Sequence, residues 1–405
     1  MQLFSVKAQK NNEFLSDVLM TVLYSSFVIL SSDTAGVYIM VSLIGIIYAL
    51  NLVSNPKVKH LHIGTFHLYM LLFAVFSLLS SFWAFSPEHA IGKGVTILEL
   101  LISFSLLYAA YYHANIERLL RIIMWTGFLL AIYAIFYYGL DYFQQAIAAE
   151  DRLENEFANV NTLGMVCSTS ILISFYYFKQ RKDYIGLLFC APALLVVAAS
   201  GSRKALVTLV LGIVYLTIFQ QNSDRKKNNK KILKVFGSLL LLGLFVIIIF
   251  ESGLFTGSLN RFDGLIASFT GGEDADSSSM IRAYFRELGF LQFLSTPILG
   301  IGMDNAYILA YKATGRDCYL HCNYAELAAN GGIVGLGLYY WIYIKILVKE
   351  YKYRKYDKHI AIIILVILLQ LIMDYGVVSY YSKETYFLLM VAMLHMNKLN
   401  RPHHG

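Results

Sequence analysis

The residues best suited to chemistry lie in the stretch Cys318-Tyr-Leu-His-Cys-Asn323, which ends the longest polar interval of a very apolar chain. His321 and Asn323 stand at the start of a long hydrophobic segment, so we expect both at the boundary between water and membrane. Polar and ionisable groups at such a boundary cost solvation free energy, which makes them candidates for function. An imidazole titrates close to neutral pH and can act as a general base toward a hydroxyl group. The alternative is a histidine of the interfacial belt, where its amphipathic ring is also comfortable.

A second group of candidates consists of basic residues that could bind an anion. Arg203 and Lys204 lie in a connection of a few residues, where Ser202 can cap the next helix and the helix start suits an anion. Arg282 and Arg286 are one helical turn apart, so their side chains leave the same face of a helix. Two guanidinium groups placed in this way can hold a phosphate or a diphosphate. The alternatives are a snorkelling arginine at 203 and a lipid-surface helix around 282 and 286.

Asparagine and cysteine residues complete the set of candidates. Asn159 and Asn161 enter a hydrophobic segment at its start, where Asn161 could bind substrate and both could instead cap the helix. Cys318 and Cys322 flank His321, but Cys-x-x-His-Cys supplies only three local ligands at a spacing that fits no common zinc module. A local disulfide between the two cysteines stays open for an oxidising compartment. We therefore expect neither a metal nor a cofactor.

The elements that must position these residues are membrane helices. Of the 405 residues, 58% are hydrophobic and 15% are charged, whereas about a quarter of a soluble protein is charged. The 30 Tyr and 27 Phe suit residues that anchor spans at both interfaces. We expect an all-α integral membrane protein with about 12 transmembrane helices, since a span needs about 20 mostly apolar residues. They are predicted at 16–32, 36–53, 66–84, 95–112, 119–139, 161–179, 184–200, 204–221, 232–250, 323–347, 359–378 and 384–398.

The basic residues predict the orientation of these spans. With the N-terminus inside, 23 of the 33 Lys and Arg fall in inner loops and at the two termini, as the positive-inside rule requires. Most of the net charge of +7 thus lies in short loops that set the orientation of the spans, and it does not indicate nucleic-acid binding. Both termini are expected in the cytoplasm. Within one membrane domain, we expect an acidic outer loop at 139–160, a large outer loop with active-site elements at 251–322, and C-terminal transmembrane helices at 323–405.

The large outer loop is expected to carry short amphipathic helices. One is predicted over Met280–Thr296, because apolar residues recur there at spacings of three and four. These residues are Ile281, Tyr284, Phe285, Leu288 and Leu291. The stretch Pro297-Ile-Leu-Gly-Ile-Gly302 then ends the helix.

Taken together, these features resemble the O-antigen ligase and Wzy-type polysaccharide polymerase superfamily. The resemblance covers most of the chain and rests on the span number, the large outer loop before the tenth span, Gly201-Ser-Arg203, and Arg282 followed by Pro297–Gly302. Its most specific element is a ligase-type signature of His, then Asn, Ser or Gln, nine residues, and Gly-x-x-Gly. His321 and Gly332-Ile-Val-Gly335 fit that signature.

The second position of the signature departs from the ligase pattern. Cys322 stands there, and Asn323 follows one place later. This departure is more typical of the polymerases, whose motifs vary more. The resemblance therefore implies an O-antigen or capsular polysaccharide polymerase, with an O-antigen ligase as the alternative.

The resemblance also implies substrates, partners and roles. The donor is an undecaprenyl-diphosphate-linked oligosaccharide, and its glycan is transferred with inversion and without a metal. The acceptor is a sugar hydroxyl of a lipid-linked glycan for a polymerase, and of lipid A core, or a protein acceptor, for a ligase. The reaction takes place outside the bacterial cytoplasmic membrane, with a chain-length regulator and a flippase of the same pathway as partners.

Roles follow for the candidate residues of this chain. His321 is expected as the general base, with Asn323 orienting it or the sugar. Arg203, Arg282 and Arg286 are expected to bind the diphosphate, and Asn161 and Lys204 are further candidates for substrate binding.

Two other classes of membrane protein stay open. A transporter or flippase would carry matching interrupted segments in two halves, and none is evident. Metal-dependent membrane glycosyltransferases resemble one another in that their first outer loop carries several acidic residues. The corresponding segment of this chain, Ser31-Ser-Asp-Thr34, has a single carboxylate, which disfavours that class.

Overall fold

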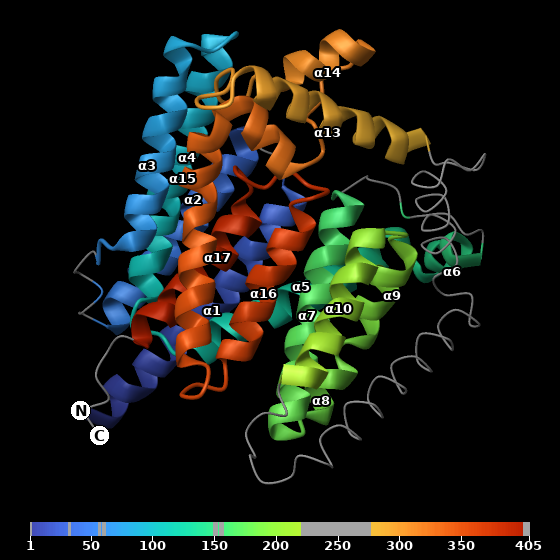
Figure 1. Cartoon of the computed structure of the whole chain (residues 1–405). Helices are drawn as coiled ribbons and strands as arrows, with labels where there is room; N and C mark the ends of the chain where they lie inside the picture. The colour runs from blue at the N-terminus through green and yellow to red at the C-terminus, as the bar shows by residue number, and fades with distance from the viewer. Residues whose placement is uncertain are drawn as a thin grey trace.

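The computed structural model describes residues 2–30, 34–55, 58, 62–148, 153, 158–219 and 277–399. Within these residues the regular structure is helical, and most helices pack side by side as a bundle (Figure 1). The long helices are α1 (Gln2–Ile29), α2 (Thr34–Ser54), α3 (Thr65–Leu79), α4 (Pro87–Tyr111), α5 (Ile116–Tyr138), α7 (Val160–Arg181), α10 (Arg203–Phe219), α15 (Asn323–Tyr353), α16 (Ile360–Met373) and α17 (Lys383–Lys398). The others are η2 (Ser80–Phe82), α6 (Leu140–Ala148), α8 (Tyr184–Leu188), α9 (Ala191–Ala199), α13 (Ser277–Ser295) and α14 (Tyr307–Thr314).

Six segments of the described chain are long and apolar enough to cross a membrane. They are Ala35–Ser54, Thr65–Phe82, Pro87–Tyr111, Ile116–Tyr138, Val160–Arg181 and Asn323–Tyr353. Large apolar side chains such as Phe136 and Ile344 point outward and are exposed, as a lipid-facing surface requires. The prediction of an all-α membrane protein is therefore confirmed.

Most described helices overlap the predicted spans, and three predicted segments need separate comment. The span predicted at 184–200 is divided into α8 and α9, because the chain turns before Pro192, which fits the first turn of a helix but not its interior. The predicted outer loop at 139–160 contains α6, which packs against α5 and α9. The span predicted at 232–250 lies outside the described residues, so the full number of spans stays a prediction.

Charged residues separate to the two ends of the bundle. At one end, Arg118 pairs with Glu13 at 3.2 Å and with Asp17 at 2.8 Å, and Lys398 donates a hydrogen bond to the carbonyl of Ala114. At the other end, α13 lies across the ends of the upright helices and α14 lies beside it (Figure 1). Arg118 and Lys398, both predicted inside, thus lie at the end opposite to α13 (Figure 1), which carries Arg282 and Arg286, both predicted outside; the assignment of each end to a compartment stays a prediction.

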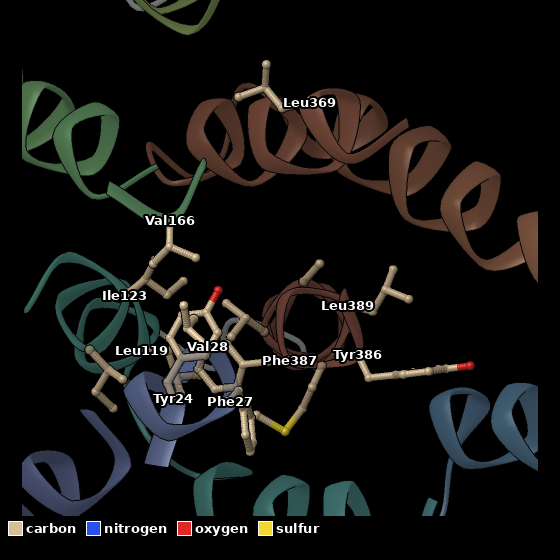
Figure 2. Close-up of a cluster of buried hydrophobic side chains, with 14 of the residues drawn as sticks. Tyr24, Phe27, Val28, Leu119, Ile123, Val166, Leu369, Tyr386, Phe387 and Leu389 are labelled. Atoms are coloured by element: carbon tan, nitrogen blue, oxygen red, sulfur yellow. The ribbon is translucent and has the colours of Figure 1, made fainter. Parts of the chain in front are cut away.

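The centre of the bundle joins the first helices to the last. The rings of Tyr24 in α1 and Phe387 in α17 have their centroids 4.4 Å apart. Leu119 of α5 and Val166 of α7 close around them (Figure 2). Because helices inside a membrane are joined by close packing of this kind, the C-terminal helices belong to the same core as the N-terminal ones.

A second contact, made by backbone, fixes the loop before α14. The amide of Ile301 donates to the carbonyl of Ala329 at 3.0 Å, and the amide of Ile333 donates to the carbonyl of Pro297 at 2.8 Å. At this point α15 has a kink at Gly332, where φ is 58° and a Cβ atom would overlap the carbonyl of Ile298. Only glycine permits this approach without strain. The Pro-Ile-Leu-Gly-Ile-Gly and Gly-x-x-Gly motifs are therefore two sides of one contact.

We predict that Gly332→Ala destabilises the protein. The added Cβ meets the backbone of residue 298, and an alanine at positive φ is strained, so the free energy of unfolding should fall by about 2 kcal/mol or more. Gly337→Ala is the matched control, because Gly337 lies in the same helix with nothing within 4 Å of its added Cβ. Heat-induced unfolding of the detergent-solubilised protein measures both, and equal midpoints would contradict the contact.

Because Lys312 and Lys352 lie toward opposite ends of the bundle, we predict that they are labelled from opposite sides of the membrane. Lys312 in α14 and Lys352 near the end of α15 are both exposed. With the native cysteines replaced, Lys312→Cys should react with an impermeant maleimide on intact cells, whereas Lys352→Cys should react only after permeabilisation. The reverse pattern would invert the predicted orientation and place the His321 segment in the cytoplasm.

Candidate functional site

His321 lies in the short segment between α14 and α15, in a left-handed backbone conformation with φ of 57°. Few residues other than glycine adopt this conformation, and it persists only where neighbouring contacts impose it. The amide of Leu320 donates to Oε2 of Glu326 at 2.8 Å. The amide of Asn323 donates to the carbonyls of Asp374 at 2.8 Å and Val377 at 3.1 Å. The turn that carries His321 is therefore fixed on both sides.

Asn323 itself is buried behind this turn. Its Oδ1 accepts a hydrogen bond from the amide of Ser379 at 2.9 Å, and its Nδ2 donates to the Tyr340 hydroxyl at 2.7 Å. Asp374, equally buried, accepts from the Ser379 hydroxyl at 2.7 Å and from the Tyr340 hydroxyl at 2.9 Å. The hydrogen bonds of Asn323 therefore fix the backbone next to His321. Asn323 is better placed to position His321 than to touch a sugar.

His321 opens onto a cleft of about 420 Å³ beneath α13. The cleft is lined by Ile281, Arg282, Phe285, Thr314, Arg316, Cys318 and His321. The His321 ring lies 4.3 Å from the ring of Tyr319 and 6.3 Å from that of Phe285, measured between centroids. The predicted helix is present as α13, and its Arg282 faces the cleft. Arg286 instead places its guanidinium 4.7 Å above the ring of Tyr375.

A cavity of about 380 Å³ is lined by Tyr319, which contacts His321, and by residues of α1, α7, α10, α16 and α17. Its polar mouth includes Asn161, Lys204 and Lys383. Its apolar inner wall includes Tyr24, Phe27, Val166 and Leu369, several of the residues drawn in Figure 2. A space that is polar at the end of the bundle and apolar inside it suits an amphiphile with a charged head group.

The two predicted asparagines serve different purposes. Asn159 caps α7, because its side chain accepts hydrogen bonds from the amides of Asn161 at 3.0 Å and Thr162 at 3.3 Å. Asn161 lines the cavity mouth. The capping interpretation thus holds for Asn159, and Asn161 keeps its place among the substrate-binding candidates.

Positive charge converges on the His321 segment. Arg203 and Arg282 both act electrostatically on Lys204, and Lys204 donates a hydrogen bond to the carbonyl of Gly376. Burial, followed by the charges of Arg282 and Lys204, lowers the pKa of His321 to about 4. The imidazole is therefore neutral at physiological pH and can accept a proton, while the surrounding cations can hold an anion.

In the described residues, Cys318, Cys322 and His321 are not brought together as a set of metal ligands. Cys318 and Cys322 are free thiols, and within the described ranges no three His, Cys, Asp or Glu side chains gather around a common point that could hold an ion. Burial raises the pKa of both thiols, which disfavours the thiolate form that binds metals. Cys322 instead packs in a small apolar cluster with Phe285 and Leu320.

Four residues near His321 are not among the sequence predictions. Glu326 and Asp374 hold the turn of His321, and each is an acidic residue beside or within an apolar segment, a signal that identifies functional candidates. Arg316 lines the cleft, and Tyr319 lines the cavity and contacts the ring of His321. Nothing in the spacing of these last two residues distinguishes them from the other polar residues of the loop.

The lowered pKa leads to a direct prediction. Unprotonated imidazole reacts with diethyl pyrocarbonate, so modification of His321, followed by peptide mass spectrometry, should titrate with a midpoint near pH 4. Arg282→Gln should move that midpoint upward, because loss of a neighbouring positive charge favours the imidazolium. Lys312→Gln, on α14, serves as the control. A midpoint near 6.5 in the unaltered protein would show that His321 is neither buried nor surrounded by cations.

Comparison with known proteins gives a match over the region that contains these candidate residues. Residues 185–340 match the family model of O-antigen ligase, and this stretch contains Arg203, Arg282 and His321. A search of curated proteins gave no match. The resemblance of the chain to the O-antigen ligase and Wzy-type polysaccharide polymerase superfamily is therefore confirmed through residues 185–340.

Proposed function

We propose that the protein is a membrane glycosyltransferase that moves a glycan from undecaprenyl diphosphate to a sugar hydroxyl, at the extracytoplasmic face of the bacterial inner membrane. One observation carries this proposal: a neutral His321 shares a cleft with Arg282, beside a cavity that continues into the membrane helices. The described residues 277–322 and the starts of α7, α10 and α15 supply the site, and the other helices form the membrane domain that holds it.

The reaction requires a base and an anion site, and the two lie side by side. His321 accepts the proton of the acceptor hydroxyl while the hydroxyl oxygen attacks the anomeric carbon of the donor sugar. The bond from that carbon to the diphosphate oxygen breaks, with inversion at the anomeric centre. The leaving group carries the electron pair as lipid diphosphate, and Arg282, Arg203 and Lys204 stabilise its charge.

The donor has a lipid part that the cavity can receive. Its isoprenoid chain lies against the apolar inner wall, and the diphosphate reaches the mouth beside Lys204 and Asn161. Arg286 supports this arrangement from a distance, because its contact with Tyr375 holds α13 against the segment after α16. Of the predicted diphosphate ligands, Arg286 thus acts by positioning Arg282.

Between the two kinds of enzyme, we favour a polymerase. At the second position of the ligase-type signature the chain has Cys322, which packs against apolar side chains and offers no amide or hydroxyl to an acceptor. An O-antigen ligase, the description of the matching family, is the alternative. The glycans of a deletion strain decide between them: a single repeat unit on its carrier indicates a polymerase, and long chains stranded on undecaprenyl diphosphate indicate a ligase.

We predict that His321→Ala lowers glycan transfer by about 10²–10⁴-fold, the usual contribution of a general base. Donor binding should persist, because the cations that hold the diphosphate remain. Arg282→Lys should weaken donor binding, since lysine keeps the charge but lacks the planar fork. A reconstituted assay with purified protein and lipid-linked donor measures transfer and donor affinity separately.

Two controls accompany these variants. Lys312→Ala, on the exposed face of α14, should leave both quantities unchanged, and a chelator should not affect the unaltered enzyme. Near-normal transfer by His321→Ala would remove it as the base. Loss of activity with a chelator and recovery with zinc would instead revive the Cys318, His321 and Cys322 metal site.

A further inference from the structure

A second polar cluster occupies the same end of the bundle and has no part in the roles proposed above. The carboxylate of Asp304 lies 3.3 Å from Nζ of Lys93 and 3.6 Å from Nδ1 of His89. The hydroxyl of Tyr380 donates to the same carboxylate at 3.4 Å. The cluster joins the start of α4 to the loop before α14 and to the loop before α17.

Aromatic rings connect this cluster with His321. The His89 ring stacks on Tyr307, with centroids 4.3 Å apart and an interplanar angle of 24°. Nζ of Lys93 lies 3.7 Å above the ring of Tyr381. Tyr381 and Tyr319 line the same cavity, and Tyr319 contacts His321. The cluster is thus connected with the candidate base through the cavity that Tyr381 and Tyr319 both line.

The polar groups of this cluster can be reached from outside. The side chain of His89 is 44% exposed and that of Asp304 is 28% exposed, so neither is enclosed in the way that a purely internal ion pair is. Asp304 also has a left-handed backbone conformation, with φ of 59°. That conformation costs about 1–3 kcal/mol in a residue other than glycine and is maintained where surrounding contacts require it.

We propose that this cluster is a subsite for a sugar ring of the acceptor glycan. Its members are His89, Lys93, Asp304, Tyr307 and Tyr381. The carboxylate accepts hydrogen bonds from sugar hydroxyls, the ammonium donates to their oxygens, and the aromatic faces cover the apolar face of a pyranose ring. The inference rests on the proposed function, because it assumes that an acceptor hydroxyl reaches His321. It further states that a neighbouring, non-reacting sugar ring of that acceptor binds at the Asp304 cluster.

The chemistry of a polymer acceptor explains why such a subsite is needed. A single hydroxyl at His321 distinguishes poorly between acceptors, because every sugar ring carries several. Specificity requires contacts with atoms that do not react, and these contacts must lie at a fixed distance from the base. The cluster supplies such contacts, because its Tyr381 lines the same cavity as Tyr319, which contacts His321.

The experiment uses the full-length protein in the inactive His321→Ala background, so that binding is measured without turnover. The probe is the repeat-unit oligosaccharide, released by mild acid from the surface polysaccharide of the cells that produce the protein. Asp304→Asn is the decisive variant, because asparagine tolerates positive φ as well as aspartate does and only the charge is lost. His89→Phe keeps a ring on Tyr307 but removes its polar nitrogens, and Lys312→Ala is the control.

Asp304→Asn should weaken binding of the oligosaccharide at least tenfold and leave the affinity for the lipid-linked donor unchanged. In the active background, the same variant should raise the acceptor KM with little change in kcat or in the donor KM. Unchanged oligosaccharide affinity, or an equal loss of donor and oligosaccharide binding, would overturn the subsite and assign the cluster a structural role. Either result leaves the proposed function intact, which the His321 and Arg282 variants test on their own.

Discussion

The structure depends most on the clamp that holds the turn of His321. One side of the turn is fixed by the carboxylate of Glu326, and the other by the backbone of Asp374 and the segment that follows it. Both carboxyl groups are buried, and a buried polar group is costly unless its hydrogen bonds are satisfied. Asp374 meets this requirement with Ser379, Tyr340 and Gln370. The ends of α15, α16 and α17 therefore meet at the residue that we propose as the base.

The same network reaches the loops before α4 and α14, because Nδ2 of Asn330 donates to Oε1 of Glu326 at 3.4 Å. Oδ1 of Asn330 accepts hydrogen bonds from the amides of Asn305 at 3.0 Å and Ala306 at 2.6 Å. Asn305 in turn accepts from the amide of Ser86 at 2.5 Å, just before α4. Buried polar networks of this kind become rigid when all their members are paired. His321 and the Asp304 cluster are thus parts of one framework, which is the condition for a base and an acceptor subsite to act at a fixed separation.

Much of this arrangement could be predicted from sequence, because its signals are local. Hydrophobic length predicts the helices, spacings of three and four predict α13, and the His321 signature predicts the active segment. The clamp could not be predicted, since Asp374 is 51 residues from Asn323 and only the folded chain brings them together. The approach of α4 to the loop at Asp304 is likewise a contact between distant segments. Lys93 is one of the ten basic residues that fall outside the predicted inner loops and termini, and the sequence gives no indication of its partner.

The electrostatics of the site give the donor a part in activating the base. In the protein alone, burial and the charges of Arg282 and Lys204 keep the pKa of His321 near 4, which makes the imidazole neutral but weakly basic. A bound diphosphate carries negative charge into the same cluster and offsets those cations, so it raises the pKa of His321 toward neutral pH. A base is most effective when its pKa is close to the ambient pH. On the proposed function, a bound donor therefore strengthens the base that removes the proton of the acceptor hydroxyl.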